Sequence, residues 1–146
     1  MNDIRQARGE DIERIAEILV FNYRLNFYPI FKDDSFYFEE LKVSKQRDNF
    51  TNALDGIWVY DDGVVKGFIQ IEEEEVKKLF VEPVLQGKSI GAELLEYAIA
   101  EKNVRFLWAL EKNTKAIAFY KRHGFGITND RKYEEDTTEF LVRMER

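Results

Sequence analysis

Apolar residues recur along this chain with two spacings, and each spacing predicts a different kind of element. Spacings of three and four residues, as in Ile12, Ile15, Ala16 and Leu19, indicate a helix with one apolar face. The first expected helix opens at Gly9-Glu10-Asp11 and has an apolar face up to Tyr23. The second runs from about Ser35 to Asn52, and the third from about Lys88 to Asn103. The last covers Ala116 to His123 and ends before Gly124.

Runs rich in β-branched and aromatic residues predict the strands. Asp61-Asp62-Gly63 separates two of these runs, and aspartate followed by glycine at such a place is typical of a hairpin turn. The expected strands cover about residues 4–7, 56–60, 64–71, 75–82, 105–110, 126–131 and 137–143.

The order of these elements predicts an α/β (α+β) fold. Antiparallel strands meander through the first half of the chain, and a β-α-β unit follows. We therefore expect a mixed, largely antiparallel sheet of six to seven strands, flanked on both faces by about four helices. Because no linker, repeat or change of composition divides the chain, residues 1–146 are expected to form a single domain.

The composition excludes several kinds of chemistry. The chain has no cysteine and one histidine, so disulfides, a thiol nucleophile, a zinc-thiolate site and a multi-histidine metal site are all excluded. No apolar stretch reaches the ~18 residues that a membrane helix needs, and the N-terminus lacks the apolar core of a signal peptide. We expect a cytoplasmic protein with no metal and no membrane partner.

The charge is unevenly distributed. The formal net charge is −6, which argues against a nucleic-acid partner. Residues 86–122, however, hold seven basic and four acidic side chains, a surplus of three positive charges against −9 for the remainder. An anionic cofactor at the basic segment and a cationic partner elsewhere would suit this distribution.

The stretch from Leu79 to Ala92 carries the clearest chemical signal. A buried-looking strand ends at Pro83, a loop of small residues follows, and an amphipathic helix begins at once. Unpaired amides and the positive end of the helix dipole make such a helix start an anion site, to which Lys88 adds a cation. An ordinary strand-to-helix loop is the alternative. The glycines of a Walker loop and of a dinucleotide fingerprint are absent.

Two motifs resemble the GNAT superfamily of acyl-CoA-dependent N-acyltransferases. Gln86-Gly87-Lys88-Ser89-Ile90-Gly91 is similar to the family's Q/R-x-x-G-x-G/A signature at Gln86 and Gly91, and departs from it at Ser89, where glycine is usual. Residues 113–125 look like its N-x-x-A-x-x-F-Y-x-x-x-G-F helix. The expected element order is also the family's order over nearly the whole chain.

The resemblance implies an acetyl-CoA site at an opening between the fourth and fifth strands. Serine in place of glycine at position 89 predicts weaker or slightly shifted binding, because its Cβ crowds the backbone while its amide and hydroxyl stay available. Asn113 is a cofactor contact by resemblance, although Asn113 or Thr114 is equally suited to cap a helix. The implied contacts are Leu79, Phe80, Val81, Gln86, Gly87, Lys88, Ser89, Ile90, Gly91, Ala92, Asn113 and Tyr120.

The resemblance also implies the catalytic groups. Tyr120 is the expected acid that protonates the departing thiolate, and its apolar spacing with Ala116 and His123 leaves a core role as the alternative. Glu75, eleven residues before Gln86, is the expected base. Glu74 or a water relay are alternatives, and a solvated glutamate turn is another reading of this acidic run.

The acceptor is expected to be a primary amine, small or peptidic, and cationic. The aromatic segment from Tyr23 to Phe38, in which Pro29 interrupts any helix, occupies the place of the family's acceptor wall. Its members most suited to face a substrate are Arg24, Asn26 and Tyr28.

With no cysteine to carry an acyl group, transfer is expected by direct attack in a ternary complex. Alternatives are a CoA-binding module without activity and an acidic protein-interaction domain. Because dimers are common in the resembling family, a homodimer is possible. We expect His123, at a helix end, to bind the last carbonyls and not to take part in catalysis.

Overall fold

The computed structural model describes residues 3–146, so Met1 and Asn2, with which the expected domain begins, lie outside the described residues. One seven-stranded sheet has the order β1-β2-β3-β4-β5-β7-β6. Neighbouring strands are antiparallel except β4 and β5, which are parallel. The mixed, largely antiparallel sheet that the sequence predicts is therefore confirmed. The strands are β1 Ile4–Gln6, β2 Ile57–Asp61, β3 Val65–Glu72, β4 Glu75–Val81, β5 Phe106–Leu110, β6 Gly126–Tyr133 and β7 Phe140–Glu145.

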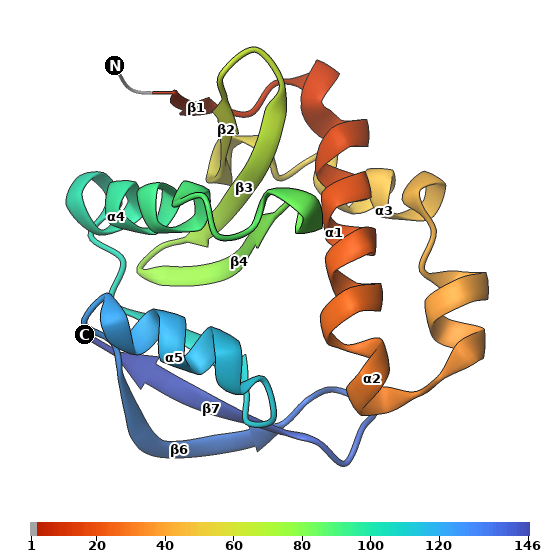
Figure 1. Ribbon diagram of the computed structural model, residues 1–146, viewed down its shortest axis with the longest axis vertical. Coiled ribbons are helices and arrows are strands. Elements are labelled where there is room, and N and C mark those ends of the chain that lie inside the picture. The colour runs from red at the N-terminus through yellow and green to blue at the C-terminus, as the bar shows by residue number, and fades with distance from the viewer. Residues whose placement is uncertain (1–2) are drawn as a thin grey trace.

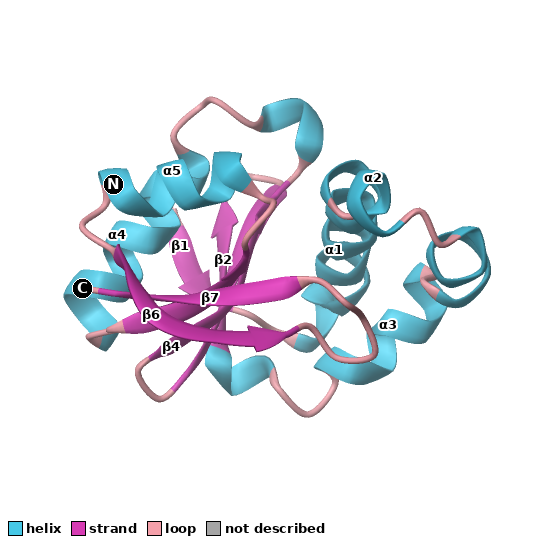
Figure 2. Cartoon of the chain, turned by 90° about the horizontal axis from the view of Figure 1, so that it is seen from below, coloured by secondary structure: helices cyan, strands magenta, loops and turns pink. Residues whose placement is uncertain are grey.

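Helices cover both faces of this sheet. Helices α4 and α5 lie on one side, and α1, α2 and α3 lie on the other (Figures 1 and 2). A π-helical turn, η2, covers Ser35–Glu40 between α2 and α3. The helices are α1 Ile12–Asn26, α2 Tyr28–Phe31, α3 Val43–Phe50, α4 Ile90–Lys102 and α5 Thr114–Arg122.

The sheet separates two hydrophobic cores. Under α4 and α5, the fully buried side chains of Leu94 and Leu95 pack with residues of β4, β5 and β7. Under α1 and α3, Ile15, Leu19 and Phe50 pack against the other face of β2 and β3. Each fully buried side chain of this size contributes about 1.5–3 kcal/mol, so both helix layers are held mainly by apolar burial.

Gly67 brings α4 close to the sheet. A Cβ at this position would lie 3.1 Å from the carbonyl oxygen of Phe80 and 3.2 Å from side-chain carbons of Ile90 and Leu94. No larger residue fits without displacing one of these groups. The first turn of α4 is thereby placed directly beside the end of β4.

The single helix expected over 35–52 is wrong, because the chain breaks between η2 and α3. Leu41 leaves helical geometry and points into the core, and Lys42 is extended. Carbonyls freed at this break need donors. Arg24 on α1 supplies them, since its Nε and Nη2 donate to the carbonyl oxygens of Tyr37 and Leu41 at 3.1 and 3.2 Å.

Two other boundaries differ from the expected ones. Pro29 does not exclude helix, because it stands at the start of the four-residue α2, where a missing N–H costs nothing. The last strand begins at Phe140, not at 137, because Thr137 donates its amide and its hydroxyl to the carbonyl of Glu134 and closes a turn.

Two further searches cover the described residues only. No helix in residues 3–146 combines the length and the apolar character needed to cross a membrane. Within the same residues, no group of three or more His, Asp or Glu side chains is arranged to hold a metal ion.

Candidate active site

β4 and β5 pair over only two residues, which confirms that the fourth and fifth strands diverge. Glu75 pairs with Phe106 and Val76 pairs with Leu107, and beyond these positions no described residue of β4 pairs with β5. The β5-facing edge of β4 from residue 77 to Val81 therefore presents backbone groups without a strand partner. Such an edge binds an extended ligand through its N–H and C=O groups.

A bulge in β4 decides which side chains face which helix layer. Gln70 of β3 pairs with Lys78, but the next residue, Ile71, pairs with Val76, so Lys77 is an extra residue on β4. After the bulge, Leu79 and Val81 join the core under α4, whereas Lys78 and Phe80 face α1 and α3.

The connection from β4 to α4 has the form of an anion site. Gly87 and Ser89 both have positive φ angles, +84° and +69°, and residues 87–89 are exposed. The first i to i−4 bond of the helix runs from the amide of Glu93 to the carbonyl of Ser89, so the amides of residues 90–92 have no partner within the helix. These amides, the helix dipole and the exposed Lys88 suit a phosphate. α4 begins at Ile90, two residues later than expected, because Ser89 is left-handed.

The side chain of Gln86 points toward α1 and ties the loop before α4 to that helix. Its Nε2 donates to Oδ1 of Asn22 at 3.1 Å. Asn22, 1% exposed on α1, in turn donates from Nδ2 to the carbonyls of Ile18 and Val81, each at 2.8 Å. Asn22 thus holds the end of β4 and the following loop against α1. Sequence reasoning missed it, although an asparagine three residues after Leu19 on the apolar helix face was the available signal.

Tyr120 lies on α5 with a free hydroxyl. Its ring packs against Phe119 and Phe125, and the hydroxyl makes no hydrogen bond within residues 3–146. Burial raises the pKa of Tyr120 above its ordinary value of 10, so the phenol stays protonated at neutral pH. The neighbouring Phe119 packs over Gly91, which places α5 beside the first turn of α4.

Two polar residues at the ends of α5 have structural contacts. Asn113 caps the helix, because its Oδ1 accepts the amide of Ala116 at 3.3 Å. His123 binds a last carbonyl of this helix through its backbone, since its amide donates to the carbonyl oxygen of Tyr120 at 3.0 Å, but its side chain does not, because Nδ1 lies 2.6 Å from Oε1 of Glu96 on α4. This pair joins the two helices on one face of the sheet.

Glu75 stands at the point where β4 and β5 begin to diverge. It is half-buried, and its Oε1 lies 3.6 Å from Nζ of Lys77. Phe80 is five residues further along β4, or about 16 Å at the usual rise of a strand. A base at Glu75 would therefore reach an amine beside Phe80 only through water.

The three expected acceptor contacts do not meet at one pocket. Arg24 binds the backbone carbonyls described above, Asn26 donates to Oδ1 of Asn22 at 3.4 Å, and the hydroxyl of Tyr28 donates to Asp34. None of the three lines the pocket that the structure shows on this side of the sheet.

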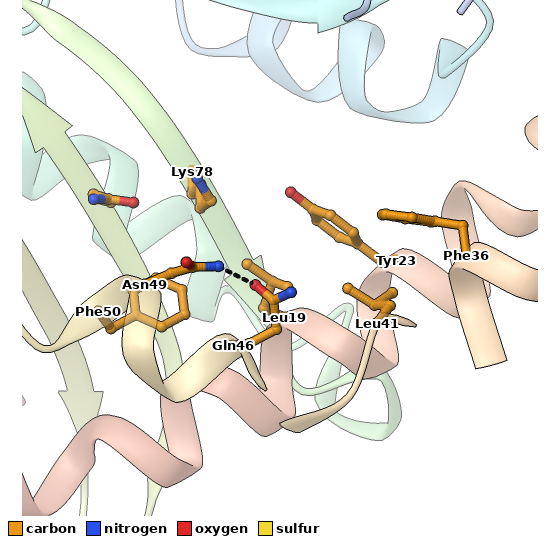
Figure 3. Close-up of a pocket in the computed structure, with 9 residues that line it drawn as sticks. Leu19, Tyr23, Phe36, Leu41, Gln46, Asn49, Phe50 and Lys78 are labelled. Atoms are coloured by element: carbon orange, nitrogen blue, oxygen red, sulfur yellow. Dashed lines mark hydrogen bonds between the residues drawn. The ribbon is translucent and has the colours of Figure 1, made fainter. Parts of the chain in front are cut away.

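That pocket lies between α1, η2, α3 and the α1-facing side of β3 and β4 (Figure 3). Its volume is about 310 Å³. Tyr23 and Phe36, from the aromatic segment that the sequence singled out, form part of its wall. The remaining lining residues are Leu19, Leu41, Gln46, Asn49, Phe50, Gln70 and Lys78.

Comparison with known proteins shows the family to which this chain belongs. Residues 53–127, half of the chain, match the Acetyltransferase (GNAT) domain family. The chain belongs to the GNAT acetyltransferase family. It is 30% identical over 129 residues to peptidyl-lysine N-acetyltransferase YjaB of Salmonella typhimurium, covering 88% of this chain and 86% of that protein. The resemblance of the two motifs is thereby confirmed.

Solved GNAT structures share the fold. The solution structure of apo-form YjaB from Escherichia coli has a TM-score of 0.80 at 24% identity and covers 97% of this chain and 95% of that one. The crystal structure of PaiA N-acetyltransferase from Thermoplasma acidophilum in complex with coenzyme A has a TM-score of 0.70 at 21% identity, with 98% of both chains covered.

The left-handed backbone at Ser89 generates a first prediction. A left-handed residue with a Cβ costs about 1–2 kcal/mol, part of which the extra unfolded-state freedom of glycine offsets. Ser89→Gly is expected to stabilise the protein by about 0.5–1 kcal/mol in thermal unfolding and to leave acetyl-CoA binding equal or tighter in a titration. Lys32→Gly, at another positive φ of +53° far from α4, is the matched control for backbone strain alone. Weaker binding by Ser89→Gly would identify the serine as a positive contact.

Proposed function

We propose that this acetyltransferase moves the acetyl group of acetyl-CoA to a primary amine of the lysine type by direct attack in a ternary complex. The observation that supports the proposal is that the edge of β4 and the start of α4 form one continuous surface for a ligand. The unpaired edge of β4 leads directly into a helix start with free amides, in a chain that belongs to the GNAT family.

The residues present fit acetyl-CoA. The backbone groups of Leu79, Phe80 and Val81 that face away from β3 would hold the extended arm, and an amide among them would polarise the thioester carbonyl. The start of α4 would hold the pyrophosphate through the amides of residues 87–92, and Lys88 would supply the opposite charge. Asn113, at the start of the neighbouring α5, would be a further contact to the cofactor. Coenzyme A in the Thermoplasma acidophilum structure supports this assignment. When bound, acetyl-CoA supplies an acyl group activated as a thioester.

Tyr120 is our candidate for the acid. Transfer releases a thiolate, whose proton must come from a neighbouring group. Burial raises the pKa of the Tyr120 phenol and so makes it a weaker acid. The same burial raises the pKa of the thiol that leaves into this space, so the difference between the two pKa values changes little. The absence of cysteine excludes an acyl-cysteine intermediate.

The lysine-type acceptor is proposed from the relatives. Both YjaB of Salmonella typhimurium and YiaC of Escherichia coli, 28% identical to this chain over 128 residues, are peptidyl-lysine N-acetyltransferases. Charge supports the same class: outside residues 86–122 the chain carries −9, which attracts cationic amines.

The first test of this function separates an enzyme from a CoA-binding module. We expect acetyl-CoA to raise the melting temperature and lysine peptides to release one free thiol for each acetyl group found by mass spectrometry. Stabilisation without thiol release on any amine would contradict catalysis. No stabilisation would contradict the acetyl-CoA site itself.

Removing the phenol tests the acid. Tyr120→Phe is expected to lower kcat about 100-fold and to leave the melting temperature and the acetyl-CoA Kd unchanged, because only the hydroxyl is lost. In the wild type, the raised pKa keeps the phenol protonated, so ionisation of Tyr120 should not lower the rate below pH ~10. Tyr97→Phe on α4 is the matched control. Full turnover by Tyr120→Phe would exclude the role.

Removing one carboxylate tests the base. Glu75→Gln is expected to lower kcat/KM about 100-fold near pH 7, where the acceptor must lose a proton. The deficit should shrink as pH approaches ~10.4, at which a lysine amine deprotonates unaided. Glu73→Gln, in the same turn and exposed, should have no effect. If Glu74→Gln alone reproduced the pH-dependent loss, the base would be Glu74.

A further inference from the structure

The pocket on the α1 side contains three polar groups whose bonding is incomplete. Nζ of Lys78 makes no hydrogen bond or ion pair within residues 3–146, and the hydroxyl of Tyr23 likewise has no partner there. Oε1 of Gln70 is buried and is the one buried side-chain N or O atom of the described residues without a hydrogen-bond partner. In Figure 3, the hydroxyl end of Tyr23 is turned toward the side of the pocket on which Lys78 lies.

An uncompensated half-buried ammonium is unfavourable unless an anion meets it. The lining includes no acidic residue; its other polar members are the amides of Gln46 and Asn49, bonded to each other at 2.8 Å. Burial lowers the pKa of Lys78, as does neighbouring Lys77, whereas Glu134 raises it. The effect of burial on this pKa thus exceeds the opposing effect of Glu134.

The pocket adjoins the proposed transfer site. Lys78 and Phe80 lie on the same side of β4 after the bulge, two residues or about 7 Å apart along the strand. The rings of Tyr23 and Phe80 are in contact, with centroids 5.6 Å apart. An acceptor with its amine beside the backbone of Phe80 would therefore place a group several bonds away inside the pocket. A volume of about 310 Å³ is at the lower end for a small-ligand site.

We propose that Lys78 determines acceptor specificity by binding a carboxylate that the acceptor carries beyond the aliphatic chain of its amine. The hydroxyl of Tyr23 donates a second hydrogen bond to this carboxylate, and Oε1 of Gln70 accepts an N–H from the same ligand. Burial, followed by Glu134 and Tyr37, raises the pKa of Tyr23 to about 12, so its hydroxyl remains a donor. The charge of Glu134 raises the pKa of both Tyr23 and Lys78, so this carboxylate acts on the two donors of the pocket.

This inference rests on the proposed function and narrows its substrate class. The preferred acceptor is an amine with an acidic neighbour, and a purely cationic polyamine lacks the group that Lys78 binds. The carboxylate has two possible sources, an acidic residue next to a peptide lysine or the carboxylate of a free amino acid. Both supply the same charge and the same two acceptor oxygens.

The test compares matched acceptors. One pair of peptides has a single lysine followed by Glu or by Gln, and a second pair is 6-aminohexanoate and its amide. We expect kcat/KM to favour the carboxylate member by about ten- to a hundredfold in at least one pair, the size of one charge-assisted hydrogen bond. The pair that shows the preference identifies the source.

Variants of position 78 assign the preference to the side chain. Lys78→Met keeps the apolar stem and is expected to bring the ratio close to one, whereas Lys78→Arg should retain most of it. Lys45→Met removes the same charge from the exposed surface of α3 and should leave the ratio unchanged. Stabilisation by acetyl-CoA, measured by melting temperature, shows that each variant is folded and binds its donor.

The outcomes are distinguishable. If the wild type acetylates no amine, the proposed function fails. If it acetylates both members of each pair equally, or if Lys78→Met keeps the full preference, the function stands and the specificity proposal is overturned. Saturation-transfer NMR of 6-aminohexanoate and its amide with the acetyl-free protein adds a readout independent of turnover, and only the carboxylate should show Lys78-dependent binding.

Discussion

The short pairing of β4 with β5 is the constraint on which the rest of the site depends. Parallel strands usually satisfy their backbone groups along their whole length, yet here two residue pairs are formed and the rest of the edge is left unpaired. An unpaired edge inside a sheet is stable only if other contacts hold the strand in place. At the carboxyl end of β4, Gly67 pairs with Val81 and lets α4 approach β3 closely, whereas the bulge at Lys77, nearer the start of the strand, sets which side chains face each helix layer.

Asn22 is the polar counterpart of these apolar contacts. A buried amide is unfavourable without partners, but Asn22 donates to two carbonyls and accepts from Gln86 and Asn26. Together these bonds reach α1 itself, the end of β4 and the loop before α4. The signature glutamine therefore acts through its side chain as a support, while the neighbouring amides remain available to a ligand.

The sequence was sufficient to predict the order of the strands, the sheet class and the family, because these depend on periodicity and on two local motifs. It was insufficient where a distant residue decides the outcome. The break at Leu41 depends on Arg24 from α1, and the pairing of His123 depends on Glu96 from α4. Lys78 escaped notice because the bulge reverses the alternation along β4, so a lysine that simple alternation would assign to one face lies on the other.

The divergence of β4 and β5 also affects how the two parts of the sheet are held together. β5 is joined to β7 over five residue pairs but to β4 over two, so the β4–β5 junction is the weakest seam in the sheet. The two hydrophobic cores lie on opposite faces of the sheet. The core under α4 and α5 contains residues of β4, β5 and β7, so it spans this junction and holds the two parts of the sheet together although few backbone hydrogen bonds join them. The unpaired edge of β4 is therefore a fixed feature of the folded protein and does not depend on separation of the two strands.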